Sequence, residues 1–94
     1  FLLIECLESA GIELGLDPAT ARRLAVETVH GAGRMAAESP DSPAELRAQV
    51  TSKGGTTAAA LQVLDTAGVR AIFAAAVAAG ARRSTELAAE FGAL

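Results

Sequence analysis

The chain has 94 residues, of which 51% are apolar and 20% charged, and a net charge of −3, so it forms at most one domain with a small core. Its scattered Lys and Arg residues and its lack of Trp and Tyr argue against nucleic-acid binding, and its longest apolar run, 71–81, is too short to span a membrane. The single Cys6 excludes an internal disulfide, and no His, Cys or acidic cluster has metal-ligand spacing, so we expect a cytoplasmic protein without a metal site.

Two helices are predicted in the first half of the chain. The first covers 1–14 and ends at Gly15, a residue type that commonly follows helix C-termini. The second covers about 18–38, with Asp17 as its N-cap and Pro18 at its first position. Both segments carry apolar residues at intervals of three and four, which indicates one buried face on each helix.

Three further helices are predicted, at about 43–50, 56–67 and 69–91. The first of them has Ser42 as a cap and Glu45 three residues later, the spacing of a capping box. Gly68 separates the last two helices. Because no segment alternates as a strand does, the sequence predicts an all-α fold, an Ala-rich bundle of about five helices.

The apolar faces of these helices are rich in alanine and too thin to close one core alone. Such a chain often completes its burial against a partner, so we expect self-association. Gly31 and Gly33 weaken their helix, and close approach of another helix is the use that we expect for them. The first residues, "FLLIECLESAG", are already apolar, so we expect the chain to belong to a longer protein.

The segment "VTSKGGTT", 50–57, differs from its helical surroundings. Gly54 and Gly55 allow a sharp turn, and Thr56 and Thr57 begin a helix whose first N–H groups lack partners. Free N–H groups, hydroxyls and the helix dipole together suit a small anion such as a carboxylate or phosphate. The alternative is an ordinary turn between helices with a threonine cap, which the local sequence alone favours. A nucleotide P-loop is excluded, because the lysine precedes the glycines and no strand leads into them.

With this turn placed, the chain resembles one enzyme family. "LRAQVTSKGGTTAAALQVLD", 46–65, is similar to the signature of pyrroline-5-carboxylate reductases, roughly L-R-x-x-V-T-S-P-G-G-T-T. "IECLESAGIELGL", "LAVETVHGAGRM" and "RRSTEL" resemble other segments of the family, in the same order and spacing. The resemblance extends over nearly all of the chain, and its central motif is long enough to be specific.

The resemblance implies a domain organisation and an activity. Reductases of this family join an N-terminal Rossmann domain, which binds NADPH or NADH, to a helical C-terminal domain that dimerises, and they also form decamers. It implies that 1–94 is the second domain, interlocked with its copy, and that the cofactor-binding residues lie outside this chain. The full-length enzyme is then expected to reduce 1-pyrroline-5-carboxylate to L-proline, and this chain alone to be inactive.

The resemblance also implies the roles of residues in the turn. Ser52, Gly54, Gly55, Thr56 and Thr57 match the family positions that meet the substrate carboxylate. Thr57 is in addition the candidate catalytic residue, because its family counterpart offers a hydroxyl that hydrogen-bonds the ring nitrogen. Whether this hydroxyl also assists protonation of the nitrogen stays open.

Three other side chains have simpler interpretations. Lys53 stands where the family pattern has proline; it either attracts the anionic substrate or points to solvent, and we favour solvent. His30 is expected to be a partly exposed structural residue, and Cys6 a small core residue.

Two other functions remain open beside the proline-forming reductase. One is a non-catalytic helical interaction module, for which Ala-rich helices suffice but which has no need of the "VTSKGGTT" turn. The other is a domain of a related imine or β-hydroxyacid reductase, which predicts a catalytic Lys or Asp on the long helix, and none stands out.

Overall fold

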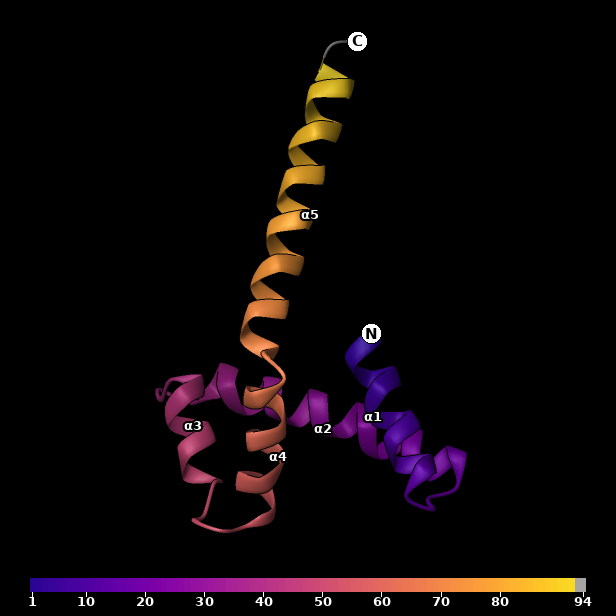
Figure 1. Cartoon of the computed structure of the whole chain (residues 1–94), viewed down its shortest axis with the longest axis vertical. Coiled ribbons are helices and arrows are strands. Elements are labelled where there is room, and N and C mark those ends of the chain that lie inside the picture. The colour runs from indigo at the N-terminus through magenta and orange to yellow at the C-terminus, as the bar shows by residue number, and fades with distance from the viewer. Residues whose placement is uncertain (93–94) are drawn as a thin grey trace. The chain divides into compact units, whose positions relative to one another are not determined.

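A computed structural model of the chain describes residues 1–92, which contain five α-helices and no strand (Figure 1). The helices are α1 (Leu2–Glu13), α2 (Pro18–Glu38), α3 (Pro43–Gln49), α4 (Thr56–Thr66) and α5 (Val69–Gly92). The predicted all-α fold is confirmed, and each helix ends within one residue of its predicted bounds. The chain divides into two compact units, Phe1–Gln49 and Val50–Leu94.

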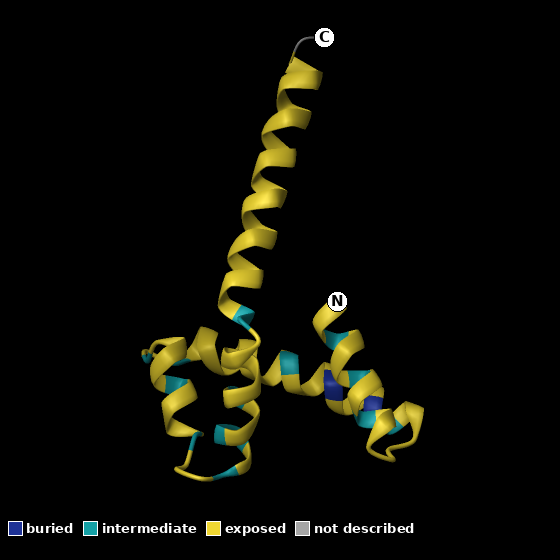
Figure 2. Ribbon diagram, viewed as in Figure 1, coloured by how far each residue is buried: buried dark blue, intermediate teal, exposed yellow. Residues whose placement is uncertain are grey.

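In the first unit, α1 packs on α2 through small residues. Ala21 and Ala25 of α2 are buried, with 2% and 4% of their surface exposed (Figure 2). A Cβ on Gly11 of α1 would lie only 3.3 Å from the Cβ of Ala21. The glycine therefore lets the two helices approach closely at this point.

Side-chain caps fix the starts of α2 and α3, as predicted. Asp17 accepts a hydrogen bond from the N–H of Thr20 at 3.1 Å and another from its hydroxyl at 2.6 Å. The hydroxyl of Ser42 accepts from the N–H of Glu45 at 3.1 Å. Each cap supplies an acceptor to an N–H group that the helix itself leaves unpaired.

In the second unit, α4 and α5 are joined by a sharp bend of 55°. Gly68 lies at the bend with φ +80°, and Arg70 forms an exposed ion pair with Asp65 across it, at 3.5 Å. Among residues 1–92 no single helix is long and apolar enough to cross a membrane, whereas α4 and α5 together meet that test as a bent pair by length and composition alone.

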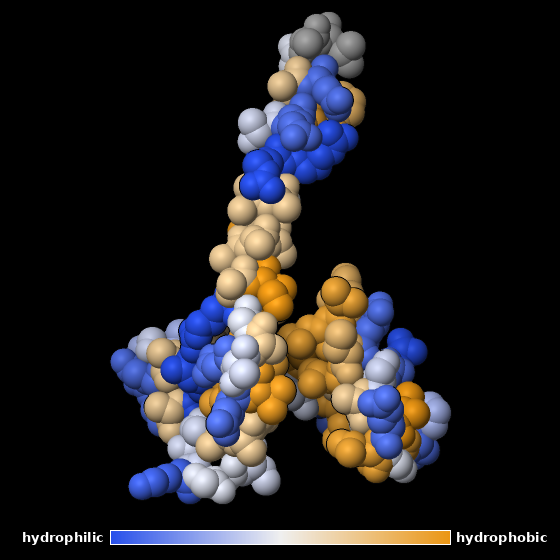
Figure 3. All heavy atoms as spheres, in the orientation of Figure 1, coloured by the Kyte–Doolittle hydropathy of each residue, from blue (hydrophilic) through white to orange (hydrophobic). Residues whose placement is uncertain are grey.

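Large apolar side chains remain exposed on both units. Across the described part of the chain, only Ala21 and Ala25 form a buried apolar core. On α5, Phe73 is 58% and Val77 71% exposed, and Figure 3 shows an apolar stretch of this helix followed by a hydrophilic one. The thin core inferred from composition is confirmed. Most large apolar side chains of a single copy stay exposed to solvent.

Several side chains show where prediction from one sequence succeeds or fails. His30 and Lys53 are exposed, as favoured. Cys6 is exposed as well, so its prediction as a core residue is wrong for the single chain. A Cβ on Gly31 or Gly33 would meet nothing within 4 Å among the described residues, so within the first unit no close helix contact occurs at these glycines.

Candidate functional site

The predicted anion-binding segment forms a tight turn in the second unit. The N–H of Gly55 donates to the carbonyl oxygen of Ser52 at 3.0 Å, which closes a four-residue turn. Gly54 has φ +74°, and no non-glycine residue among 1–92 has a positive φ, so φ of Lys53 is negative. This combination is that of a type II turn, which requires a residue tolerant of positive φ at its third position and often has proline at its second. The turn thus accounts for Gly54, and also for the proline that the family pattern has in place of Lys53.

Gly55 is favoured for a different reason. Its φ of −85° and ψ of 179° are open to any residue. A Cβ at this position, however, would overlap the Oγ of Ser52 and lie 3.2 Å from the Ser52 carbonyl oxygen. The second glycine therefore makes room for the serine side chain, which folds back over the turn.

The first N–H groups of α4 have no partner in the described part of the chain. Gly55 is the N-cap residue and supplies no side-chain acceptor, and the first bond to the cap runs from the N–H of Ala59 to its carbonyl at 3.1 Å. The N–H groups of Thr56, Thr57 and Ala58 donate to no acceptor within residues 1–92. Glycine occupies the N-cap position, so the threonine cap of the alternative interpretation is wrong, while an ordinary turn between helices stays open. The helix start therefore offers three donors and the positive end of its dipole to an anion.

The hydroxyl of Thr57 also lacks a partner within the described residues. Threonines inside the other helices bond back to the chain: the hydroxyl of Thr28 donates to the Leu24 carbonyl at 2.7 Å, and that of Thr85 to the Ala81 carbonyl at 3.1 Å. Thr57 lies in the first turn of α4, so the carbonyl four residues earlier belongs to the preceding turn and not to the helix. Its half-buried side chain thus keeps a hydroxyl available for a ligand.

The five predicted site residues thus lie together in one turn and the helix start that follows it. Ser52, Gly54 and Gly55 shape the turn, and Thr56 and Thr57 contribute N–H groups. Thr56 is exposed. Their roles in substrate binding stay predictions. Among the residues that take part, sequence reasoning missed Ala58, whose role depends only on its backbone N–H and leaves no signal in the side chain.

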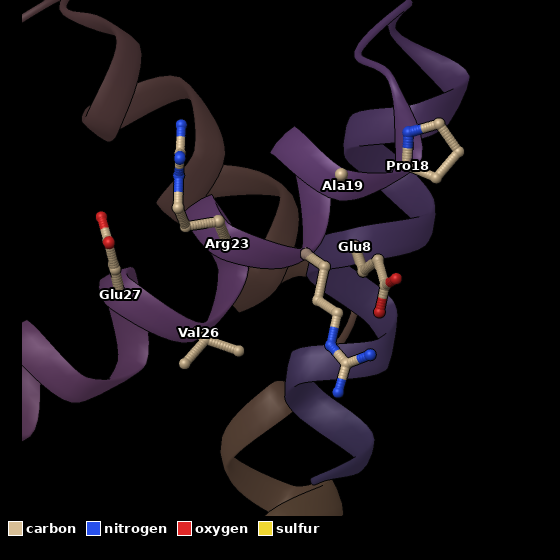
Figure 4. A pocket seen from close by; sticks show the side chains of 7 residues that line it. Glu8, Pro18, Ala19, Arg23, Val26 and Glu27 are labelled. Atoms are coloured by element: carbon tan, nitrogen blue, oxygen red, sulfur yellow. The ribbon is translucent and has the colours of Figure 1, made fainter.

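A pocket of about 710 Å³ opens in the first unit, where α1 and α2 pack (Figure 4). It is lined by Glu8, Pro18, Ala19, Arg22, Arg23, Val26 and Glu27. None of these is a predicted site residue, and two arginines beside two glutamates favour neither an anion nor a cation. Sequence reasoning did not single them out, because charged residues at these spacings are typical of a solvated helix face.

Comparison with known proteins identifies the family. The sequence profile of the pyrroline-5-carboxylate reductase dimerisation family matches residues 1–87. The chain is therefore a helical dimerisation domain by class. It belongs to the family of pyrroline-5-carboxylate reductases.

Similar proteins carry the same description. The pyrroline-5-carboxylate reductase of Corynebacterium melassecola is 48% identical over 87 residues, which make up 93% of this chain and 32% of that protein. A solved pyrroline-5-carboxylate reductase of Coxiella burnetii has a TM-score of 0.88 at 45% identity, over 93% of this chain and 32% of that one. The Plasmodium falciparum pyrroline carboxylate reductase, solved with NADP bound, has a TM-score of 0.85 at 30% identity, over 88% of this chain and 34% of that one. The chain thus spans about a third of the length of these relatives.

Proposed function

We propose that this chain is the dimerisation and substrate-side domain of a pyrroline-5-carboxylate reductase, which reduces 1-pyrroline-5-carboxylate to L-proline. Family membership and the names of the relatives support this activity. The main structural support for the proposed role of this domain comes from the start of α4. Its three unpartnered N–H groups lie within the segment that matches the family signature.

In the proposed complex, the N–H groups of Thr56, Thr57 and Ala58 receive the substrate carboxylate. Hydrogen bonds to a charged acceptor are about twice as strong as neutral ones, so this contact anchors one end of the ring. The Thr57 hydroxyl then hydrogen-bonds the ring nitrogen, which carries a proton in the product. The domain contributes binding and orientation.

Reduced nicotinamide, either NADPH or NADH, supplies the hydride to the imine carbon when it is bound. The NADP in the Plasmodium falciparum relative supports this cofactor class. We place the residues that bind it outside this chain, in the part of the relatives that the chain does not span.

We further propose that two copies pair through the exposed apolar faces, in an interlocked homodimer that is able to assemble further into decamers. Burial of each large side chain such as Phe73 or Val77 would stabilise the folded dimer by about 1.5–3 kcal/mol. The single chain lacks this contribution, because these side chains are exposed in it. Two buried alanines offer far too little to offset the ordering of a whole chain.

The test is reduction of 1-pyrroline-5-carboxylate by the full-length protein, followed by nicotinamide absorbance, with NADPH and NADH compared by kcat/KM. We expect proline formation with at least one of the two cofactors, and no activity from residues 1–94 alone. A full-length protein that is folded yet binds neither cofactor would contradict the proposal.

A further inference from the structure

Lys53 carries the one charge in the turn, and no acidic residue lies close to it in the sequence. Its side chain is exposed and forms no ion pair within residues 1–92. No Asp or Glu occurs between Leu46 and Leu64; the flanking acids are Glu45 and Asp65, and Asp65 pairs with Arg70. Lys53 thus belongs to the same turn as the start of α4, whose first N–H groups also carry partial positive charge.

Exposure to solvent does not cancel the effect of such a charge on an approaching anion. The screening length is about 8 Å at physiological ionic strength, so an exposed charge still acts on anions that come within that distance. Charges at the rim of a binding site chiefly change the association rate and the salt dependence of binding.

We propose that Lys53 is a specificity-determining residue, whose ammonium group favours imine substrates that carry a carboxylate over those that do not. The inference rests on the proposed function, since it assigns Lys53 to the same anion site. The substrate keeps its carboxylate throughout the reaction, so the attraction acts equally on the bound substrate and the transition state. Lys53 accordingly changes KM and leaves kcat unaltered.

The experiment compares four forms of the full-length enzyme: the parent, Lys53→Gln, Lys53→Arg and Arg82→Gln. Lys53→Gln removes the charge at similar length, and Lys53→Arg keeps it. Arg82→Gln is the matched control, because Arg82 is exposed on α5 and makes no ion pair among the described residues, so it alters net charge equally. Each form is assayed with 1-pyrroline-5-carboxylate and with 1-pyrroline, which lacks the carboxylate, from low to high salt.

We expect Lys53→Gln to lower kcat/KM for 1-pyrroline-5-carboxylate about two- to fivefold at low salt, through KM alone. The loss should fade towards 1 M salt, where the screening length is about 3 Å. Lys53→Arg and Arg82→Gln should match the parent, and 1-pyrroline should show no change in any form. Equal kcat/KM for the parent and Lys53→Gln would overturn the inference while leaving the proposed function intact. So would a loss of kcat/KM that is the same at low and high salt, or the same for 1-pyrroline-5-carboxylate and 1-pyrroline. An inactive parent enzyme would instead contradict the proposed function itself.

Discussion

Gly55 and Ser52 hold the turn before α4 together through two contacts. The N–H of Gly55 donates to the Ser52 carbonyl at 3.0 Å, and the Ser52 hydroxyl occupies the space that a Cβ on residue 55 would need. A side chain at position 55 must displace the serine and crowd the first N–H groups of α4. The residue types in "SKGG" are therefore restricted in two ways: Gly54 by its positive φ, and Gly55 by the space that the Ser52 side chain fills.

Gly55→Val should raise KM for 1-pyrroline-5-carboxylate about tenfold or more, because hydrogen bonds to a charged group contribute about 1.5–3 kcal/mol each. We expect a smaller fall in kcat, since the branched side chain obstructs the anion site and not the cofactor. Steady-state kinetics across substrate concentration measures the change, with circular dichroism as the check of folding. Gly55→Ala together with Ser52→Ala, which removes the overlapping hydroxyl, should show a smaller loss than Gly55→Ala alone. Wild-type kinetics in a folded Gly55→Val enzyme would mean that the turn only starts a helix.

Thr57→Ala should lower kcat more than it raises KM if, as proposed, its hydroxyl meets the ring nitrogen, where charge changes during reduction. Loss of one such donor in a preorganised site typically costs about 2.7–4 kcal/mol, and we expect less here because water is able to enter a partly open site. Thr57→Ser keeps the hydroxyl and should retain most of kcat. Thr85→Ala is the control, since the Thr85 hydroxyl bonds within α5. If kcat of Thr57→Ala equals that of the parent, Thr57 is not a catalytic residue.

Lys53→Pro should stabilise the fold by about 0.4–1 kcal/mol, because proline suits the second position of a type II turn and restricts the unfolded chain. The N–H of Lys53 donates to no acceptor within residues 1–92, so its loss is tolerated. Urea unfolding of parent and variant measures the difference. A lower midpoint in the variant would show that the turn has another backbone conformation.

The Asp17 cap predicts a dependence of stability on pH. Hydrogen bonds from Thr20, first from its hydroxyl and then from its backbone N–H, lower the pKa of the Asp17 carboxyl below its ordinary value of 3.8. A lowered pKa in the folded state adds stability that is present above 3.8 and is lost as the pH falls through the folded value. Thermal unfolding of the parent and Asp17→Asn, which caps without a charge, should therefore differ most above pH 4 and converge in stronger acid. A difference that stays constant down to pH 2 would rule out this linkage.

The helices were predictable because their signals are local. Asp17 and Ser42 cap the following helices through side chains that the sequence displays, and Gly68 separates α4 from α5. The turn was predictable only in part. Positive φ at Gly54 follows from residue type, whereas the need for glycine at 55 depends on the position of the Ser52 hydroxyl, which no sequence pattern contains.

Burial was the least predictable property. Cys6 lies within an apolar helix pattern. Such a pattern indicates which face of the helix is apolar, but not whether the same chain or another molecule covers that face. Ala21 is buried where α1 approaches at Gly11, a contact between helices that helical spacing alone does not specify.

The most direct test of self-association is sedimentation equilibrium of residues 1–94 at low micromolar concentration. A helical dimerisation domain should sediment with at least twice the chain mass of 9.4 kDa, because the large apolar side chains of α5 need a second copy to cover them. Circular dichroism on the same sample establishes that the chain is folded. A folded, helical species at 9.4 kDa would contradict self-association of this domain.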